Sequence, residues 1–334
     1  MPWTLAEHAQ AQRDPLRKGV YLGIVRESVI ADILNFESTG TLQKTGVRYD
    51  SVISPEYIPI SGTIPEKTAR GKQISWGVYE QAVHIDVPIP LEKEDGLLEK
   101  PSARLAKLAT IGSAYVFQNQ FVNGDQGSDP NGFDGINKII GNLASAQAVG
   151  ATELDIRAAA SPTSATMQSL IDRLDEAIDA VDGHNPDFAL CNRQFGLRIR
   201  SIFRREGLLG DNHNWVTQGF PFGDMRAKLS TAATRPMFVY NDIPFYDAGV
   251  QADQATQVIL NTYTEGGSTS TGTRVFFVKL GEDNLQGLQY SPPRMRSIGV
   301  LENKEVERSR FIWDHGIAVW GHRSISKVQG VRVA

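Results

Sequence analysis

The sequence is poor in cysteine: Cys191 is the only one in 334 residues, which excludes an internal disulfide framework. It lies in the apolar run 188–191, Phe-Ala-Leu-Cys, where a cysteine is expected to be a small buried side chain. A nucleophilic cysteine needs a neighbouring base and a lowered pKa, and the surrounding sequence gives no sign of either. We therefore interpret Cys191 as part of the core.

Long apolar runs are also missing. No stretch approaches the ~18 apolar residues of a membrane span, and the N-terminus lacks the apolar core and cleavage site of a signal peptide. These absences predict a protein that is made and folded in a cytosol and does not enter a membrane. With 41% hydrophobic and 22% charged residues, the composition is typical of a globular chain with a buried core.

The sequence has no excess of basic charge. Its formal net charge is -4 at pH 7, whereas tight nonspecific binding to phosphate groups needs a strong basic excess. The charge balance argues against a protein that grips nucleic acid, but it is compatible with loose enclosure of nucleic acid.

Motifs for catalysis and cofactor binding are absent. A phosphate-binding loop needs glycine, four residues and then Gly-Lys-Ser/Thr, but Gly71-Lys72 is followed by glutamine. No Gly-x-Gly-x-x-Gly follows an expected strand, and there is no Gly-x-Ser-x-Gly elbow. The histidines are scattered, and His315 and His322 would lie on opposite faces of an unbroken strand. We predict no enzymatic activity, no cofactor and no metal.

The stretch 121–136 concentrates glycine, aspartate, asparagine and proline. Clustered oxygen ligands suit a calcium ion. The side chains that could supply them are those of Asp125, Asp129, Asn131 and Asp134. However, the third position of an EF-hand loop would be Gly127, and no glutamate closes the loop at position twelve. We therefore favour turns held by Asx-type hydrogen bonds, with a cation site as the alternative.

Two expected helices carry clusters of charge. The helix over 163–182 has four acidic residues largely on its polar side, which we interpret as a solvated face and not as an acid–base pair: Asp172, Asp175, Glu176 and Asp179. The helix over 192–205 has a basic cluster: Arg198, Arg200, Arg204 and Arg205. A solvated face is the favoured interpretation of this cluster, and DNA or an acidic neighbouring subunit are the alternatives.

The first part of the chain predicts an arm, a helix and a long hairpin. The arm covers residues 1–15, and a helix with its proline in the first turn follows. One apolar face of this helix is formed by Leu22, Val25, Val29, Ile33 and Phe36. Two long strands over 47–60 and 73–89 are joined by a polar tip at 61–71. Because such a hairpin is marginal alone, we expect it to pack on a partner subunit.

The remainder of the chain predicts two further patterned helices and several strands. The helix over 102–123 begins at the N-cap Ser102, and its inward side is formed by Leu105, Leu108, Ile111, Tyr115 and Val122. The helix over 163–182 buries Met167, Leu170, Ile171, Leu174, Ile178 and Val181. Strands are expected at 188–191, 237–240, 243–246, 258–263, 274–279, 311–313, 317–320 and 328–333. This order predicts an α+β fold and not a doubly wound sheet.

Several of these segments resemble a known family. They are the helix end Phe121-Val-Asn-Gly-Asp125, the exit Asp129-Pro-Asn-Gly-Phe-Asp-Gly-Ile136, Ala189-Leu-Cys-Asn-Arg193 before a basic helix, and Tyr240-Asn-Asp-Ile-Pro-Phe-Tyr-Asp247. Their order, over residues 4 to 333, resembles major capsid proteins of tailed phages with the Hong Kong 97 fold. No single motif is as specific as a catalytic signature, so the ordering carries the resemblance.

The resemblance implies a division into domains. Residues 1–45 would be the N-terminal arm and 46–92 an extended loop that lies over a neighbouring subunit. Residues 93–150 with 291–324 would form a peripheral domain around the spine helix, and 151–290 with 325–334 an axial domain. Candidate contacts between subunits are Lys67, Arg70, Lys72, Trp76 and Tyr79.

The resemblance also implies partners. Copies would assemble as hexamers and pentamers into an icosahedral head in the host cytoplasm, around loosely held double-stranded DNA. Because the chain begins almost directly with the arm, a separate scaffolding protein is expected, together with a portal and a decoration protein. No crosslink is predicted from Lys67 or Lys72, since no acceptor motif is identifiable. The alternatives are an encapsulin-type compartment shell and, from another class, a soluble hydrolase or binding protein.

Overall fold

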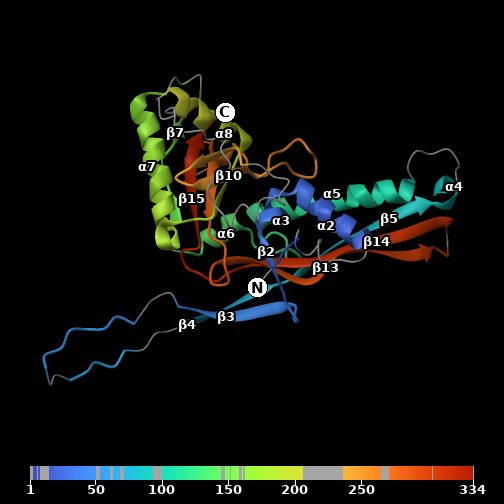
Figure 1. Cartoon of the computed structure of the whole chain (residues 1–334), viewed down its shortest axis with the longest axis horizontal. Coiled ribbons are helices and arrows are strands. Elements are labelled where there is room, and N and C mark those ends of the chain that lie inside the picture. Colours follow the sequence, from blue (N-terminus) through green and yellow to red (C-terminus); the bar gives the residue numbers. More distant parts are fainter. Residues whose placement is uncertain are drawn as a thin grey trace.

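The computed structural model describes residues 3–5, 7, 15–49, 53–60, 63–67, 71–92, 100–143, 147–150, 152–157, 160, 162–205, 236–264, 271–302 and 304–333. The described chain is of the α+β class, as the sequence predicts, and contains three sheets. Figure 1 shows a compact part, an elongated part that extends away from it, and a narrow hairpin that projects in a third direction.

The elongated part is a long helix on a five-stranded sheet. The sheet has the order β1-β2-β13-β14-β5, formed by Trp3–Thr4, Asn35–Ser38, Leu285–Val300, Val306–Val319 and Tyr79–Pro88. Helix α5, Pro101–Asn123, lies along the sheet (Figure 1), and α2, Pro15–Glu27, and α3, Val29–Ile33, pack beside it. The short helices are α4, Ile89–Glu92, and α6, Ile136–Ile140.

The compact part is an eight-stranded sheet with two helices on one face. Its main path is β6-β15-β12-β8-β10-β9, formed by Ala148–Val149, Ile325–Arg332, Thr271–Val278, Phe188–Cys191, Ile243–Asp247 and Phe238–Tyr240. Strand β7, Leu154–Asp155, pairs with β15, and β11, Tyr263–Thr264, pairs with β12. The helices are α7, Ser164–Ala180, and α8, Arg193–Arg205; the 3-10 helix η2, Asp182–His184, follows α7.

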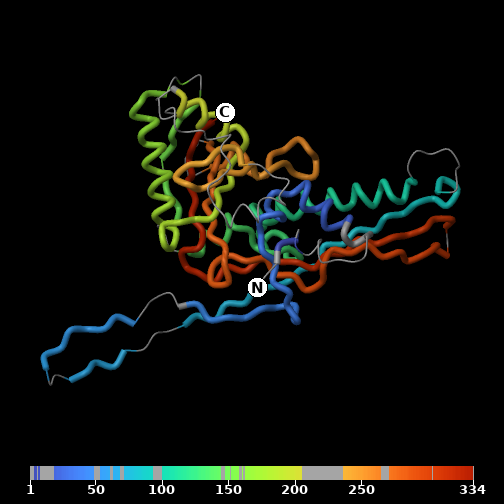
Figure 2. Tube along the Cα trace, in the orientation of Figure 1, coloured from blue at the N-terminus to red at the C-terminus, as the bar shows by residue number. Residues whose placement is uncertain are grey.

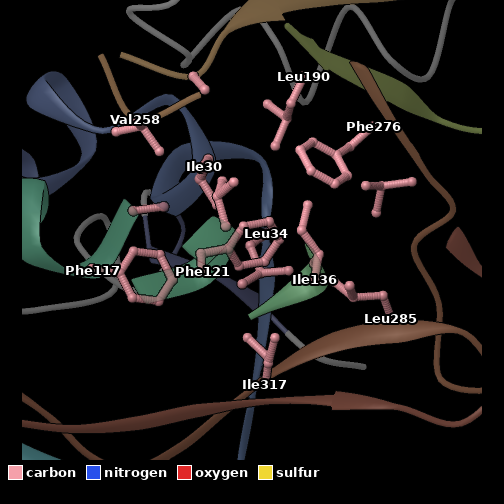
Figure 3. Packing of buried hydrophobic residues seen from close by; sticks show 14 of the residues in the cluster. Ile30, Leu34, Phe117, Phe121, Ile136, Leu190, Val258, Phe276, Leu285 and Ile317 are labelled. Atoms are coloured by element: carbon pink, nitrogen blue, oxygen red, sulfur yellow. The ribbon is translucent and has the colours of Figure 1, made fainter. Parts of the chain in front are cut away.

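Successive side chains along the strands of the compact part point to opposite faces of the sheet, so the buried residues are divided between two cores. In β8, Phe188 and Leu190 belong to a core shared with α5, whereas Ala189 and Cys191 belong to a core under α7 and α8. Figure 3 shows the first core, where Leu190 and Phe276 lie across from Phe121. The eight-stranded sheet is thus covered on both faces, and its first core continues into the elongated part.

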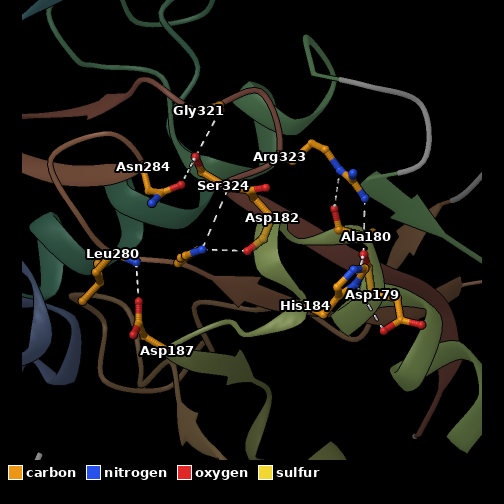
Figure 4. Close-up of polar contacts among 11 residues, drawn as sticks. Asp179, Ala180, Asp182, His184, Asp187, Leu280, Asn284, Gly321, Arg323 and Ser324 are labelled. Atoms are coloured by element: carbon orange, nitrogen blue, oxygen red, sulfur yellow. Dashed lines mark hydrogen bonds and ion pairs between the residues drawn. The ribbon is translucent and has the colours of Figure 1, made fainter. Parts of the chain in front are cut away.

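Two neighbouring connections carry the chain between the parts, from β12 to β13 and from β14 to β15 (Figure 2). The Trp320 N–H donates to Asn284 O at 2.9 Å, and the Ser324 hydroxyl lies 3.1 Å from Asn284 Oδ1. Nearby, the Leu280 N–H donates to Asp187 Oδ2 at 2.6 Å (Figure 4). These bonds fasten the two connections to each other and to the compact part.

Several predicted elements of the compact part are confirmed. Helix α7 begins after Thr163, whose hydroxyl accepts from the Thr166 N–H at 3.3 Å. The residues predicted to face inward on α7 are buried, apart from the partly buried Ile171. Strand β8 and the basic helix α8 lie where the sequence predicts them, and Cys191 is fully buried.

The predicted helix from residue 15 to 36 is wrong in its second half. The helix ends at Glu27, a new helix begins after the N-cap Ser28, and Phe36 lies in strand β2. Leu22, predicted to face inward, is 47% exposed. The break has a local cause, because the Ser28 hydroxyl accepts from the Ala31 N–H at 3.3 Å and so competes with a continuous helix.

The inward face of α5 is also different from the prediction. Lys100, not Ser102, is the N-cap, and Leu105 and Leu108 are exposed. The buried face instead carries Thr110, Ser113, Ala114, Phe117, Gln118, Phe121 and Val122. Small side chains let α2 approach closely: a Cβ on Gly23 would lie 2.9 Å from Thr110 Cγ2. Which face of α5 is buried therefore depends on how closely the neighbouring elements approach it, and not on hydrophobicity alone.

The strand predicted at 258–263 is largely absent. Val258 and Ile259 are buried, but they lie in a loop that hydrogen bonds to α5 and to the start of α8, and only Tyr263–Thr264 forms a strand. The Asn123 amide donates to Val258 O at 2.7 Å, and Gln257 Oε1 accepts from the Arg193 N–H at 3.3 Å. Side-chain amides therefore satisfy backbone groups that a strand partner would otherwise satisfy.

Candidate assembly surface

The hairpin is an antiparallel ribbon of β3, Gln43–Tyr49, and β4, Gly71–Gly77, with Gln43 opposite Gly77 and Tyr49 opposite Gly71. This corrects the predicted strands: the first runs over 43–49 instead of 47–60, and the second is divided at Val78. After Val78 the chain continues as β5, which pairs with β14 and not with β3. The base of the hairpin is therefore fixed to the five-stranded sheet.

One face of the ribbon rests on the body of the molecule. Gly46, Ile74 and Trp76 are partly covered, whereas Thr45 and Val47 on the other face are exposed. A Cβ on Gly46 would overlap the ring of Trp320. Lys44 lies 5.6 Å from the centroid of the same ring and forms an ion pair with Glu37. These contacts fix the direction in which the hairpin leaves the body.

Beyond Tyr49 and Gly71 the hairpin extends away from the body (Figure 1). Its described residues, 53–60 and 63–67, form no strand, and apolar side chains on them are exposed. Tyr57 and Ile60 are fully exposed, and Ile64 is 78% exposed. Ile53 and Ile58 are exposed as well. Apolar side chains clustered in this way are typical of a surface that another molecule covers.

The structure places the predicted contact residues in two groups. Lys67 lies in the projecting segment, where its Nζ donates to Ser54 O at 2.9 Å and forms an ion pair with Glu56. Lys72 is exposed opposite Arg48 in the ribbon. Arg70 lies outside the described residues. Contact of Lys67, Arg70 and Lys72 with a neighbour remains a prediction.

Trp76 and Tyr79 form the second group, at the base of the hairpin. Trp76 packs against the first core, and its buried Nε1 has no hydrogen-bond partner among the described residues. The Tyr79 hydroxyl accepts from Gln126 Nε2 at 2.7 Å. The pKa of Tyr79 is raised, mainly by desolvation and to a smaller extent by the negative charge of Asp134. Both side chains attach the hairpin to its own chain, and a role toward a neighbour stays a prediction for them.

The apolar residues of the tip are not predicted as contact residues. The sequence pattern predicts a strand at Tyr57 and Ile60 and a polar tip at Ile64, although Pro55, Pro59 and Pro65 interrupt this segment. Proline removes backbone donors and so prevents a continuous ladder. Apolar residues within a proline-interrupted segment were the available signal that these side chains need cover from outside.

The turn cluster after α5 is stabilised by hydrogen bonds from backbone N–H groups, which confirms the turn interpretation. Asp125 Oδ1 accepts from the Gly127 N–H at 2.9 Å and Asp129 Oδ1 from the Asn131 N–H at 3.1 Å. Asp125 also forms an ion pair with Lys138 at 3.1 Å. The hydrogen bond from Lys138, and to a smaller extent that from the Gly127 N–H, lowers the pKa of Asp125. Across the described residues, no three metal-ligating side chains gather in one place.

Cys191 has the surroundings of a structural residue. Its thiol lies 3.6 Å from Tyr246 O, and burial raises the pKa of Cys191. A thiol held neutral in this way is a poor nucleophile. None of the helices in the described part of the chain has both the length and the apolar character needed to cross a bilayer.

Comparison with solved structures identifies the fold. The chain superimposes on the SrpI encapsulin of Synechococcus elongatus PCC 7942 with a TM-score of 0.59 and 12% sequence identity, covering 92% of this chain and 88% of that one. The capsid of a native GTA particle gives a TM-score of 0.58 at 12% identity, covering 91% and 89%. A chain of Microbacterium phage Oxtober96 gives 0.54 at 10% identity, covering 91% of each chain.

No protein-family profile matches the sequence, and no curated protein sequence matches it significantly. The likeness is therefore one of structure, and it extends over almost the whole chain. The chain has the Hong Kong 97-like capsid fold, as the order of its sequence segments predicts.

Proposed function

We propose that this chain is the major capsid protein of a tailed-phage-like particle, in which copies assemble as hexamers and pentamers into an icosahedral shell around double-stranded DNA. The observation that carries the proposal is the projecting hairpin. It exposes Tyr57, Ile60 and Ile64 far from the cores of its own chain, in a fold shared with chains of shell assemblies. Only another molecule can remove these side chains from water.

The energetics favour association through this surface. Full burial of one large aliphatic or aromatic side chain contributes roughly 1.5–3 kcal/mol. Burial of three such side chains from each copy, repeated around a shell, contributes a free energy of the size needed to offset the translational and rotational entropy that is lost on association. The ribbon beneath them is already fixed by Trp320, so little further ordering of β3 and β4 is required when a neighbour binds.

The proposed domain division corresponds broadly to the elongated and compact parts, which share the first core. Most of the elongated part would belong to the peripheral domain, 93–150 with 291–324, and most of the compact part to the axial domain, 151–290 with 325–334. Strand β6 and the start of β13 lie across these bounds. The extended loop, 46–92, would then include β5, which pairs with β14 of the elongated part. In this arrangement the loop lies over a neighbour while its base stays within its own subunit.

The proposed partners follow from the same assignment. The shell protein would be assembled in the host cytoplasm with a scaffolding protein, would be joined by a portal and a decoration protein, and would reside in the virion. Its net charge of -4 supports loose rather than tight contact with the packaged DNA.

An encapsulin-type compartment shell is the second candidate, and a specific observation favours it: the SrpI encapsulin superimposes as well as the phage-related chains. The two functions differ in what the shell encloses. A phage shell would enclose DNA that enters through a portal, whereas a compartment shell would enclose a protein cargo.

Electron microscopy of the expressed chain, with and without the proteins of its neighbouring genes, tests the proposal. Hollow polyhedral particles or ring-shaped capsomers are expected. Nuclease-protected DNA in particles from the native source would support the phage function, and a co-purifying enzyme would support the compartment. A chain that remains monomeric at high concentration, with every candidate scaffold present, would refute both.

A further inference from the structure

The compact part carries two helices of opposite charge. Exposed carboxylates occupy the polar side of α7: Asp172, Asp175, Glu176 and Asp179. Helix α8 contains five arginines and no acidic residue: Arg193, Arg198, Arg200, Arg204 and Arg205. Both helices cover the same face of the eight-stranded sheet. Figure 1 shows α7 along the outer edge of the compact part, with α8 set apart from it.

The charges on α7 are arranged against the stability of the isolated chain. Asp172 and Glu176 are four residues apart, as are Asp175 and Asp179, and like charges at this spacing repel. The last turn of α7 contains no basic residue, although a helix C-terminus favours cations. Arg323, from outside the helix, supplies the cation at this terminus, and the repulsion between the carboxylates is a cost that a further cation would reduce.

Nearby cations neutralise this acidic stripe only in part. Arg173 points to the loop before the helix, where it donates to Thr152 O at 3.0 Å and to Thr152 Oγ1 at 2.8 Å. Arg323 donates to the backbone carbonyls of Ala180 and Asp179 at the end of α7 (Figure 4). His184 Nδ1 lies 3.5 Å from Asp179 Oδ1, so a protonated His184 pairs with Asp179 within the chain. None of the ion pairs of the described residues includes Asp172 or Glu176, and these two carboxylates remain available to a cation from outside.

Helix α8 shows the complementary arrangement. Its first residue is Arg193 and its first turn has no acidic residue, although a helix N-terminus favours anions. Arg204 is exposed, Arg198 is half-exposed, and Leu197 between the arginines is 52% exposed. None of the ion pairs of the described residues joins α7 to α8.

We propose that the acidic stripe of α7 on one copy docks against the arginines of α8 on the next copy, and that this contact closes the rings of the shell. The inference rests on the proposed function, and it adds a second interface to the one formed by the hairpin. Two different surfaces of the same chain form a head-to-tail contact, which generates a closed ring when the rotation between copies allows it. Because the charges are solvent-exposed, salt weakens the contact.

Two charge-reversed variants test the contact. Glu176→Lys with Asp179→Lys reverses the charge at two of the four acidic positions of α7, and Arg198→Glu with Arg204→Glu reverses it at two of the five arginines of α8. Each variant alone is expected to lose rings and shells in electron microscopy and sedimentation velocity. The unassembled α7 variant is expected to melt at the same or a higher temperature than unassembled wild type, because lysine suits a helix C-terminus. Loss of assembly with unchanged folding separates docking from a structural role.

Mixing the two variants gives a sharper result. At the substituted positions, the first variant has lysines facing the arginines of α8, and the second has glutamates facing the carboxylates of α7. The two variants can therefore alternate around a ring, so only rings with an even number of copies close. Co-expression is expected to restore six-membered rings but not five-membered ones, and hence no closed icosahedral shell. A chain that carries both reversals is expected to restore shells. The matched control, Arg198→Lys with Arg204→Lys, keeps the charge and should assemble as wild type does.

The outcomes separate this inference from the proposed function. Wild type that never assembles overturns both. Wild type that forms shells while each reversed variant also forms them overturns the docking of α7 on α8 and leaves the shell function intact. Folded variants that fail alone and form no rings when mixed also overturn the docking.

Discussion

Trp320 packs against Gly46 so closely that a side chain at residue 46 would overlap its ring. Residue 46 lies in the hairpin, and residue 320 lies where β14 ends and the chain turns toward the compact part. One contact therefore joins the projecting hairpin to the junction of the two parts of the molecule.

We expect Gly46→Ala to displace the hairpin. Overpacking at a well-packed contact costs about 1–3 kcal/mol. The displacement should appear as faster proteolysis between residues 50 and 70 and as weaker assembly. Gly40→Ala is the matched control, because no atom lies within 4 Å of a Cβ built there. Equal protease resistance of both variants and wild type would show that the contact does not orient the hairpin.

We expect Ile60→Ser with Ile64→Ser to weaken association without affecting the fold. Both side chains are exposed in the single chain, so the free energy of unfolding should change by no more than about 0.5 kcal/mol. Loss of two buried aliphatic contacts should weaken each association step at least about tenfold. Light scattering measures the strength of association, and chemical denaturation measures the free energy of unfolding. Leu22→Ser, also at an exposed site, is the control, and assembly of the tip variant at wild-type concentrations would contradict the prediction.

We expect Asp32 to stabilise the folded chain less at neutral pH than in mild acid. It is 5% exposed, its Oδ2 has no partner among the described residues, and burial raises its pKa to about 6. The folded pKa lies above the unfolded value of 3.8, so the stabilisation by the protonated form is lost as pH rises through about 6. Asp32→Asn should raise the stability by roughly 1–3 kcal/mol at pH 8, with little gain at pH 4. Thermal melts at both values decide this, with Asp129→Asn as the exposed control.

His315 has the opposite dependence on pH. Its ring lies 4.1 Å from that of Trp313 and 5.1 Å from that of Phe117, and burial lowers the pKa of His315 to about 3. His315 therefore becomes protonated below about pH 6.5 in the unfolded state, but only below about pH 3 in the folded state. Over this window the residue should cost about 1.4 kcal/mol of stability for each pH unit of acidification.

A His315→Phe variant removes this titration. The difference in unfolding free energy between wild type and variant should grow as pH falls from 6.5 to 4, in favour of the variant. Urea denaturation at several pH values measures the difference. A difference that does not change with pH would show that the imidazole is not kept neutral in the folded protein.

The elements with regular patterns could be predicted from the sequence. Met167, Leu170 and Leu174 repeat at helical spacing and are buried in α7, and Phe188 to Cys191 form a fully buried strand. The asparagine and aspartate turns after α5 were predictable for a similar reason, since Asp125 and Asp129 bond to backbone groups two residues away. In these places the side chain and its partner are neighbours in the sequence.

Predictions failed where the partner is distant in the sequence. Phe36 continues a helical pattern but pairs in a sheet with Gly287, and Leu105 is more hydrophobic than Thr110 but is exposed while Thr110 is buried. For the candidate assembly surface, the sequence indicated a projecting hairpin but not which side chains it exposes. That depended on where β5 leaves the hairpin to pair with β14.

The sequence by itself determined the local periodicities, the turns and the opposite charges of α7 and α8, because each depends on residues within a few positions of one another. Only the tertiary structure decided which faces are covered and which are left open, since burial depends on contacts between segments far apart in the chain. Ile60 and Ile325 are the same residue type, yet the first is fully exposed on the hairpin and the second is buried in the core.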